Sequence, residues 1–281
     1  MQIILLGTGG PRIDLRRSGP SQVVYVDDEP ILVDCGRGLL GQLTRANIPV
    51  NKIDRVLITH HHLDHISDFA DFAIYSWFTG RERPLEVYGP RDTRSIVDAL
   101  FKTVYKMDVE SRLRVGERSG YVKSPPEFKV QDISAGLVLE DKQYKITAAL
   151  VDHWRTAIPE FKYDALGFRI DSSEGSVCIS GDTIPCKDLI DLAKGADVLV
   201  HECYISKDEV SSNPHVRYLA GNIHTTSDQV GKVAKKANVK KLVLSHIKEK
   251  SDALLRKMLD DVEQDFDGEV IIGEDLLQVE V

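Results

Sequence analysis

The seven residues from Thr59 to His65, Thr-His-His-His-Leu-Asp-His, constrain this chain more than any other stretch, because they place metal-binding side chains directly after the apolar run Arg55 to Ile58. The side chains that can bind a metal are those of His60, His62, Asp64 and His65. Side chains on a strand repeat every two residues, so the first two histidines point the same way if the chain is still extended there. A turn then brings Asp64 and His65 to a second position nearby. The spacing predicts two adjacent metal sites at the end of a buried strand.

Three more side chains of the ligand type follow apolar strands predicted later in the chain. His153 comes after 146–151, Asp182 after 177–179, and His246 closes the run 242–246. Polar groups at the strand ends of a packed sheet are where ligand sites gather. We therefore assign His60, His62 and His153 to one ion. Asp64, His65 and His246 are assigned to a second ion, with Asp182 bridging the two.

Two ions are expected because seven candidate ligands exceed the four that a tetrahedral zinc ion accepts. Nitrogen and oxygen ligands suit Zn²⁺, while Mn²⁺ and Fe²⁺ accept the same set, so the sequence leaves the metal open. Two neighbouring cations lower the pKa of a shared water until a bridging hydroxide exists near neutral pH. The predicted chemistry is hydrolysis.

The rest of the chain predicts a mixed α/β domain over residues 1–281. Strands are expected at 2–6, 22–26, 31–33, 55–58 and 85–88, a meander at 128–151, and further strands at 167–170, 176–179, 198–201, 241–244, 270–272 and 276–281. Helices are expected at 38–46, after an N-cap at Ser67, from Asp92 to about 103, and at 187–193, 227–237 and 251–266. The charged segment Lys106 to Ser124 has no clear period and predicts a surface loop. Whether it is a lid, an exosite or a dimer contact stays open.

Composition limits the class of protein. The net charge of −8 argues against a general nucleic-acid binder held by phosphate contacts. No apolar segment approaches the roughly 20 residues that cross a bilayer, and the first residues lack the pattern of a secretory signal, so we expect a cytoplasmic protein with no membrane contact. The four cysteines, Cys35, Cys178, Cys186 and Cys203, make no C-x-x-C pair and are expected to be free buried thiols.

The pattern His60-x-His62-x-Asp64-His65, followed by His153, Asp182 and His246, resembles the metallo-β-lactamase superfamily over nearly the whole chain. Five further motifs resemble the branch that contains ribonuclease Z and its arylsulfatase-like relatives: Leu6 to Pro11, Ser180 to Thr183, Val200 to Cys203, His224 to Thr226, and Ser245-His246. The resemblance implies a four-layer αββα sandwich. It also implies a homodimer.

The resemblance further implies that Glu202 and His224 form a pair that protonates the leaving oxygen. A carboxylate beside an imidazole raises the basicity of the ring, which suits a general acid whose proton must be available near pH 7. We therefore expect Asp64, Glu202 and His224 to act in catalysis. Of the other histidines, His61 is expected to pack or to support a ligand, and His201 to lie in the core beside Glu202.

The substrate is less constrained. Asp182 follows His153 by only 29 positions, without the basic arm that ribonuclease Z enzymes often carry there, and Arg16-Arg17-Ser18 departs from the family's Arg-Asn. Gly80-Arg81, Pro84 to Pro90 and Asp108 to Arg112 resemble arylsulfatase-type relatives.

These departures favour a small or medium anionic ester, a phosphodiester or a sulfate ester, as the substrate. A tRNA 3′-processing endoribonuclease and a non-catalytic ligand-binding member of the fold are the alternatives. The residues expected to contact the substrate are Arg12, Arg16, Arg17, Arg155 and, on a loop with Ser212, His215.

Overall fold

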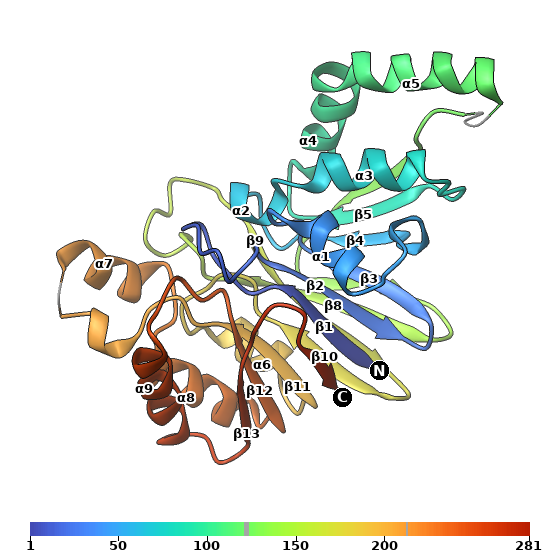
Figure 1. The fold of residues 1–281 in the computed structure, drawn as a ribbon. Helices are drawn as coiled ribbons and strands as arrows, with labels where there is room; N and C mark the ends of the chain where they lie inside the picture. The colour runs from blue at the N-terminus through green and yellow to red at the C-terminus, as the bar shows by residue number, and fades with distance from the viewer. Residues whose placement is uncertain (121–123, 212) are drawn as a thin grey trace.

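The computed structural model describes residues 1–120, 124–211 and 213–281, and within them two seven-stranded sheets lie face to face (Figure 1). The first sheet runs in the order β14 (Gln278–Glu280), β1 (Gln2–Gly7), β2 (Ser21–Val26), β3 (Glu29–Val33), β4 (Arg55–Leu57), β5 (Leu85–Gly89) and β6 (Phe128–Asp132). The second runs in the order β13 (Glu269–Ile272), β12 (Lys241–Ser245), β11 (Val198–Glu202), β10 (Gly175–Ile179), β9 (Ala165–Ser172), β8 (Tyr144–Val151) and β7 (Gly136–Glu140).

Helices cover the outer face of each sheet. The first sheet packs against α1 (Leu39–Arg45), α3 (Phe69–Phe78) and α4 (Thr93–Ala99), and the second against α6 (Lys187–Leu192), α8 (Ser227–Ala237) and α9 (Asp252–Glu263). Strand β1 shows the cause. Ile3 and Leu5 face the core between the sheets, while Ile4 and Leu6 face the helices, because successive side chains of a strand point to opposite faces. The result is the predicted αββα sandwich of the metallo-β-lactamase fold.

The strand directions bring the polar strand ends together. Strands β10, β11, β12 and β13 are parallel, and β8 runs in the same direction because β9 is antiparallel to both β8 and β10. The carboxyl ends of β8, β10, β11 and β12 therefore lie at one edge of the second sheet. In the first sheet β4 is parallel to β3 and β5, and Thr59 accepts a hydrogen bond from the backbone of Leu166 at the start of β9 (2.8 Å). This contact joins the histidine-rich motif to that edge.

The loop predicted for Lys106 to Ser124 is wrong, because residues Lys106–Ser119 form the helix α5, which projects beyond the sandwich (Figure 1). A π-helical turn, Leu100–Val104, joins it to α4. Only Val109 and Gly116 of α5 are buried, so the helix has almost no apolar face to give a periodic signal. Pairs four residues apart support it instead, as between Asp108 and Arg112 (2.8 Å). Residues 121–123 of the predicted loop lie outside the described residues.

The expected meander at 128–151 is also wrong in its pairing. Strand β6 pairs in parallel with β5 in the first sheet, whereas β7 and β8 form an antiparallel pair in the second. Alternation of apolar residues identifies strands, but it does not identify their partners.

Besides α5, two α-helices were not predicted. They are α2 (Leu63–Ile66), within the motif itself, and α7 (Pro214–Asn222). In addition, α3 begins after Asp68 rather than at a Ser67 cap. Helix α7 has a readable start, since the Asn213 side chain accepts a hydrogen bond from the His215 backbone (2.8 Å) and proline occupies the first turn. Two short 3₁₀ turns, Val50–Lys52 and Lys207–Glu209, complete the described elements.

No helix among the described residues has both the length and the apolar character needed to cross a membrane. All four cysteines are free thiols, as expected. Three of them are buried, and Cys186 is half-buried.

The contact between α8 and α9 gives a test of the packing. A Cβ atom added at Gly231 would lie 2.5 Å from the backbone oxygen of Val262, whereas one added at Gly41 on α1 would meet nothing within 4 Å. Both changes to alanine gain the same helix propensity, so the difference isolates the steric effect. We expect Gly231→Ala to lower the free energy of unfolding by about 1–3 kcal/mol relative to Gly41→Ala, measured by urea denaturation. Equal stabilities of the two variants would contradict this packing.

Candidate metal centre

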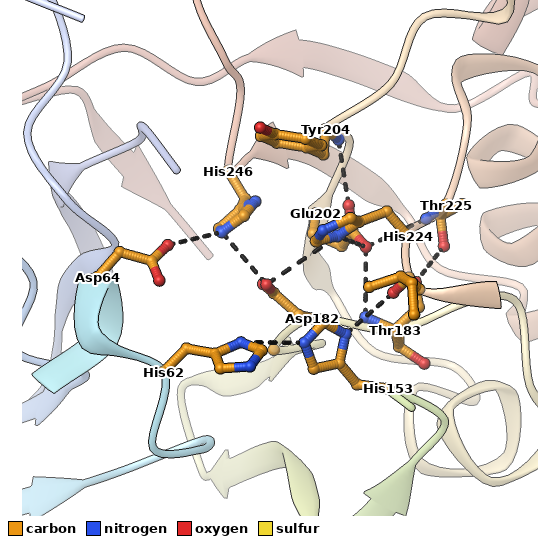
Figure 2. Close-up of polar contacts among 12 residues, drawn as sticks. His62, Asp64, His153, Asp182, Thr183, Glu202, Tyr204, His224, Thr225 and His246 are labelled. Carbon is orange, nitrogen blue, oxygen red and sulfur yellow. Dashed lines mark hydrogen bonds and ion pairs between the residues drawn. The ribbon is translucent and has the colours of Figure 1, made fainter. Parts of the chain in front are cut away.

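Three imidazole rings meet where β4 and β8 end. The Nδ1 atom of His62 lies 3.0 Å from Nε2 of His60 and 3.2 Å from Nε2 of His153 (Figure 2 draws the second contact). Nitrogen ligands of a tetrahedral zinc ion at ordinary bond lengths lie about 3.3 Å apart. The three rings thus converge with the spacing that one ion requires.

The opposite nitrogens of two of these rings are held by the protein. His153 Nδ1 donates to the backbone oxygen of Ile223 (3.0 Å), which leaves Nε2 with its lone pair free. Nδ1 of His60 lies 3.0 Å from the hydroxyl of Thr59. Contacts of this kind fix the tautomer and the orientation of metal-binding histidines.

A second group forms where the turn after the motif meets the end of β12. His246 Nε2 lies 3.3 Å from Asp64 Oδ2, and His65 Nε2 lies 3.7 Å from the same oxygen. His246 adopts a left-handed backbone conformation, with φ of 55°. The ring fits because residue 10 is glycine, where a Cβ atom would lie 2.9 Å from the His246 ring.

Asp182 lies between the two groups. Its Oδ2 atom is 3.8 Å from His60 Nε2 and 3.3 Å from His246 Nε2, and its Oδ1 atom is 3.4 Å from His65 Nε2. The turn before it needs glycine, because Gly181 has a φ of 60° and an added Cβ atom would lie 2.7 Å from the oxygen of Leu166. Asp182 therefore has the position of a bridging ligand.

The pKa shifts divide these groups by environment. Burial lowers the pKa of His62, lowers that of His60 well below its usual range, and lowers that of His153 to about 3. Burial opposes protonation of His65 as well, but Asp182 and Asp34 outweigh it and raise the pKa of His65 well above its usual range. Burial likewise opposes ionisation of Asp182, but the His246 and His65 rings outweigh it and hold its pKa well below its usual range. The first group thus holds neutral imidazoles, and Asp182 is ionised, which are the forms that bind metal ions. His65 holds a proton against Asp182 and Asp34, and a bound cation would take the place of that proton.

Two buried atoms of the centre support this interpretation. Nε2 of His65 and Oδ1 of Asp182 have no hydrogen-bond partner, although they lie beside one another. Buried polar atoms are rarely left unpaired in folded proteins. A cation between them would satisfy both atoms. The three histidines of the first group offer a site for another cation, so the residues present fit two divalent ions.

Glu202 and His224 lie next to Asp182 (Figure 2). Glu202 Oε1 is 3.0 Å from His224 Nδ1 and accepts hydrogen bonds from the backbone of Thr225 (3.1 Å) and Thr183 (3.3 Å). Its Oε2 accepts one from the backbone of Tyr204 (3.1 Å). These donors hold the carboxylate in place, and the carboxylate orients the His224 ring with Nε2 on its free side.

The residues predicted to contact the substrate lie in different environments: one is buried, and the others are half-exposed or exposed. Arg17 is buried, and its guanidinium donates to Thr8 Oγ1 (2.6 Å) and to the backbone of Gly273, so that prediction is corrected: Arg17 supports the fold near the centre. Arg16 donates to the backbone of Lys250 (2.8 Å), and Arg155 contacts Asp188 (3.2 Å), although both remain about half exposed. Arg12 is exposed.

His215 is exposed too, but it lies in the first turn of α7 and not in a loop, which corrects the predicted loop. Ser212 of that segment lies outside the described residues. The two remaining histidines lie where they were expected. His61 Nε2 donates to the hydroxyl of Thr93 (2.8 Å), and His201 is buried with Nδ1 donating to the backbone of Glu202 (2.7 Å).

Sequence reasoning missed three residues of the centre. Asp34, at the end of β3, accepts from His65 Nδ1 (2.8 Å) and from the backbone and hydroxyl of Thr59 (both 2.8 Å). Tyr204 packs its ring 4.6 Å from that of His224, and Tyr163 stacks on His62 at 5.1 Å. Asp34 carried a readable signal, because it too follows an apolar strand.

Comparisons with known proteins agree with this geometry. Residues 30–247 match the family model described as the Beta-lactamase superfamily domain. The chain is 33% identical over 290 residues to "Ribonuclease Z" of Mycolicibacterium gilvum, which covers all of this chain and 96% of the relative. It is 34% identical over 289 residues to "Ribonuclease Z" of Mycobacterium bovis, covering all of this chain and 98% of the relative.

Among solved structures, the metallo-β-lactamase fold protein YhfI of Bacillus subtilis has a TM-score of 0.74 at 21% identity, covering 100% of this chain and 99% of that one. The short form of human tRNase Z has a TM-score of 0.72 at 21% identity, covering 99% and 98%. At these identities the two structures bear on the fold.

Asp34 gives a test of the second ligand group. Asp34→Asn keeps the shape and the left-handed backbone of this residue (φ 60°) but removes the charge behind His65. We expect metal affinity to fall by about 10- to 100-fold, measured by metal content after dialysis against buffered Zn²⁺. The control is Asp68→Asn, because Asp68 accepts two backbone hydrogen bonds from Gly38 and Leu39 (2.7 and 3.1 Å). Equal metal loss in both variants would remove Asp34 from the centre.

Proposed function

This chain belongs to the metallo-β-lactamase superfamily and to its ribonuclease Z branch, and from that premise we propose that it cleaves phosphodiester bonds in RNA as a tRNA 3′-processing ribonuclease Z. The coarser statement, a metal-dependent hydrolase of ester bonds, follows from the family itself. The proposal concerns the substrate and the residues that act on it.

The contact between Glu202 and His224 carries the proposal. An RNA phosphodiester releases a ribose oxygen, which is a poor leaving group until it receives a proton. His224 Nδ1 lies 3.0 Å from Glu202 and 4.0 Å from Asp182 Oδ2, so the ring can hold a proton at the border of the candidate ligand cluster. A positioned acid of this kind contributes typically 10²- to 10⁴-fold to the rate.

In this proposal His60, His62 and His153 would hold one divalent ion, Asp64, His65 and His246 would hold the other, and Asp182 would be a ligand of both. Bound ions supply an activated water and stabilise negative charge on the phosphate oxygens. The protein's own part is to fix the ligands: Asp34 orients His65, and the carbonyl of Ile223 orients His153. Zinc is the metal we favour for this ligand set, and Mn²⁺ and Fe²⁺ remain alternatives.

The comparisons favour the alternative that sequence reasoning placed second. Relatives that match all of the chain are named ribonuclease Z. The net charge of −8 and the short interval after His153 had argued against RNA. Both arguments carry less weight than similarity over the full length of the chain, because a local site can bind RNA whatever the net charge of the whole chain. A small anionic ester stays a second candidate, and a non-catalytic member is disfavoured by the complete ligand set.

The homodimer implied by the resemblance and the single domain over residues 1–281 stay predictions. Sedimentation of the metal-loaded protein tests the first, and limited proteolysis the second.

His224→Ala tests the proposed acid. We expect kcat for cleavage of a precursor tRNA to fall by about 10²- to 10⁴-fold with metal content retained. Hydrolysis of bis(4-nitrophenyl) phosphate should fall much less, because nitrophenolate is a stable anion that leaves without a proton. Glu202→Gln should show the same selectivity to a smaller degree. Equal losses on both substrates would assign a structural role to the pair.

Metal removal tests the reaction class. We expect chelator-treated protein to lose cleavage of both precursor tRNA and bis(4-nitrophenyl) phosphate, and to regain both after addition of Zn²⁺ or Mn²⁺. Aryl sulfate is the discriminating third substrate. Reconstituted protein that hydrolyses aryl sulfate or the small diester but neither binds nor cleaves the tRNA at low salt would replace the proposed function with the small-ester reaction.

A further inference from the structure

A row of stacked aromatic rings leads from the candidate metal centre to the surface. Tyr163 stacks on the candidate ligand His62, with ring centroids 5.1 Å apart and planes inclined by 26°. Phe161 stacks on Tyr163 in turn, at 5.7 Å and 9°. Phe161 is 58% exposed, while the Tyr163 ring is half-buried. The row therefore ends in a large apolar ring whose outer part faces solvent.

The loop that carries these rings, residues 152–164 between β8 and β9, is fixed along its length. Ile158 donates to the backbone of Trp154 (2.8 Å), Phe161 to Ile158 (2.9 Å), and Tyr163 to Phe161 (2.7 Å). The guanidinium of Arg91 donates to the backbone of Lys162 and contacts Asp164 (3.4 Å). A ring held in this way loses little conformational freedom on binding a flat partner.

We propose that Phe161, backed by Tyr163, stacks on an unpaired base of the RNA substrate next to the phosphate at the metal centre. This proposal rests on the proposed function and adds to it a base-binding subsite, the aromatic platform formed by Phe161 and Tyr163. No part of the catalytic scheme above uses either ring.

The distances suit this substrate. The two centroid separations place the Phe161 ring no more than about 11 Å from that of His62, and a base on its outer face adds ~3.5 Å. That is the reach of a nucleotide one or two positions from the phosphate. Stacking on aromatic rings is also how proteins bind unpaired bases without reading their sequence.

The charges beside the platform suit a nucleotide better than an apolar protein segment. Lys162, between Phe161 and Tyr163 in the sequence, is exposed, and in the described part of the chain its ammonium has no ion pair. Asp164 is neutralised by Arg91, which leaves Glu160 as the acidic neighbour in the sequence. A flat base on Phe161 places its phosphate within reach of the free lysine.

Binding of a labelled RNA hairpin with an unpaired 3′ tail tests the platform. The metal-loaded His224→Ala protein serves as the background, so that the RNA is bound without rapid turnover. We expect Phe161→Ala to weaken binding about tenfold, and Phe161→Trp to retain it. Leu137→Ala is the matched control, since Leu137 on β7 is 60% exposed and lies outside the loop.

Abasic nucleotides supply the second half of the test. An abasic nucleotide is placed in turn at each position within two nucleotides of the cleavage site. At one of these positions it should weaken binding of the RNA about tenfold, as Phe161→Ala does. At that position Phe161→Ala should add no further loss, because both changes remove the same contact. If Phe161→Ala has no effect, or weakens intact and abasic RNA equally at every position, the platform is rejected.

The two proposals fail in different ways. If the protein with His224 intact cleaves precursor tRNA but Phe161→Ala leaves RNA affinity unchanged, the ribonuclease assignment is supported and the platform is rejected. If that protein cleaves no RNA, yet Phe161 and one base are coupled in binding, the platform stands and the reaction assignment falls. If no RNA binds at low salt, both fall.

Discussion

The buried carboxylate of Asp182 is the group on which the rest of the centre depends. It is almost fully shielded from water and lies within 4 Å of four imidazole rings, those of His60, His65, His224 and His246. A buried charge is costly unless it is compensated, so the surrounding rings and any bound cations stabilise it. The sandwich supplies that compensation because strands of both sheets deliver side chains to the same place.

Outer contacts then fix the rings around this charge. Asp34 joins His65 to Thr59, the carbonyl of Ile223 holds His153, and Glu202 is held by three backbone N–H groups while it orients His224. Each contact couples one candidate ligand or acid to a strand end or to the segment that joins α7 and α8. The centre is thus built on rigid elements, which keeps its groups in place before a metal or substrate arrives.

The region around the centre divides into two sides. On the side of β11 and β12, His224, Tyr204 and His246 lie ring against ring, which suits proton transfer at the leaving oxygen. On the side of the loop 152–164, His62, Tyr163 and Phe161 form a stack that reaches solvent. One loop region therefore carries the proposed acid, and another loop at the same edge carries the proposed base contact. Substitutions in the second loop can alter substrate specificity without altering the candidate metal ligands.

The sequence by itself determined most strands and the convergence of seven candidate ligands, because buried strands leave apolar runs and ligands at strand ends leave polar residues directly behind them. The αββα class came from the resemblance of its motifs to a known family. It did not determine the helix α5, whose narrow buried face gives no period, or the separation of β6 from β7 into different sheets. It placed Arg17 at the substrate, whereas the fold buries it against Gly273, 256 residues away. Asp34 follows an apolar strand, but only the fold shows that it accepts a hydrogen bond from His65. Tyr163 and Tyr204 acquire their roles only from the tertiary structure, because a contact between residues distant in the chain depends on how the two sheets are brought together, and no local pattern records it.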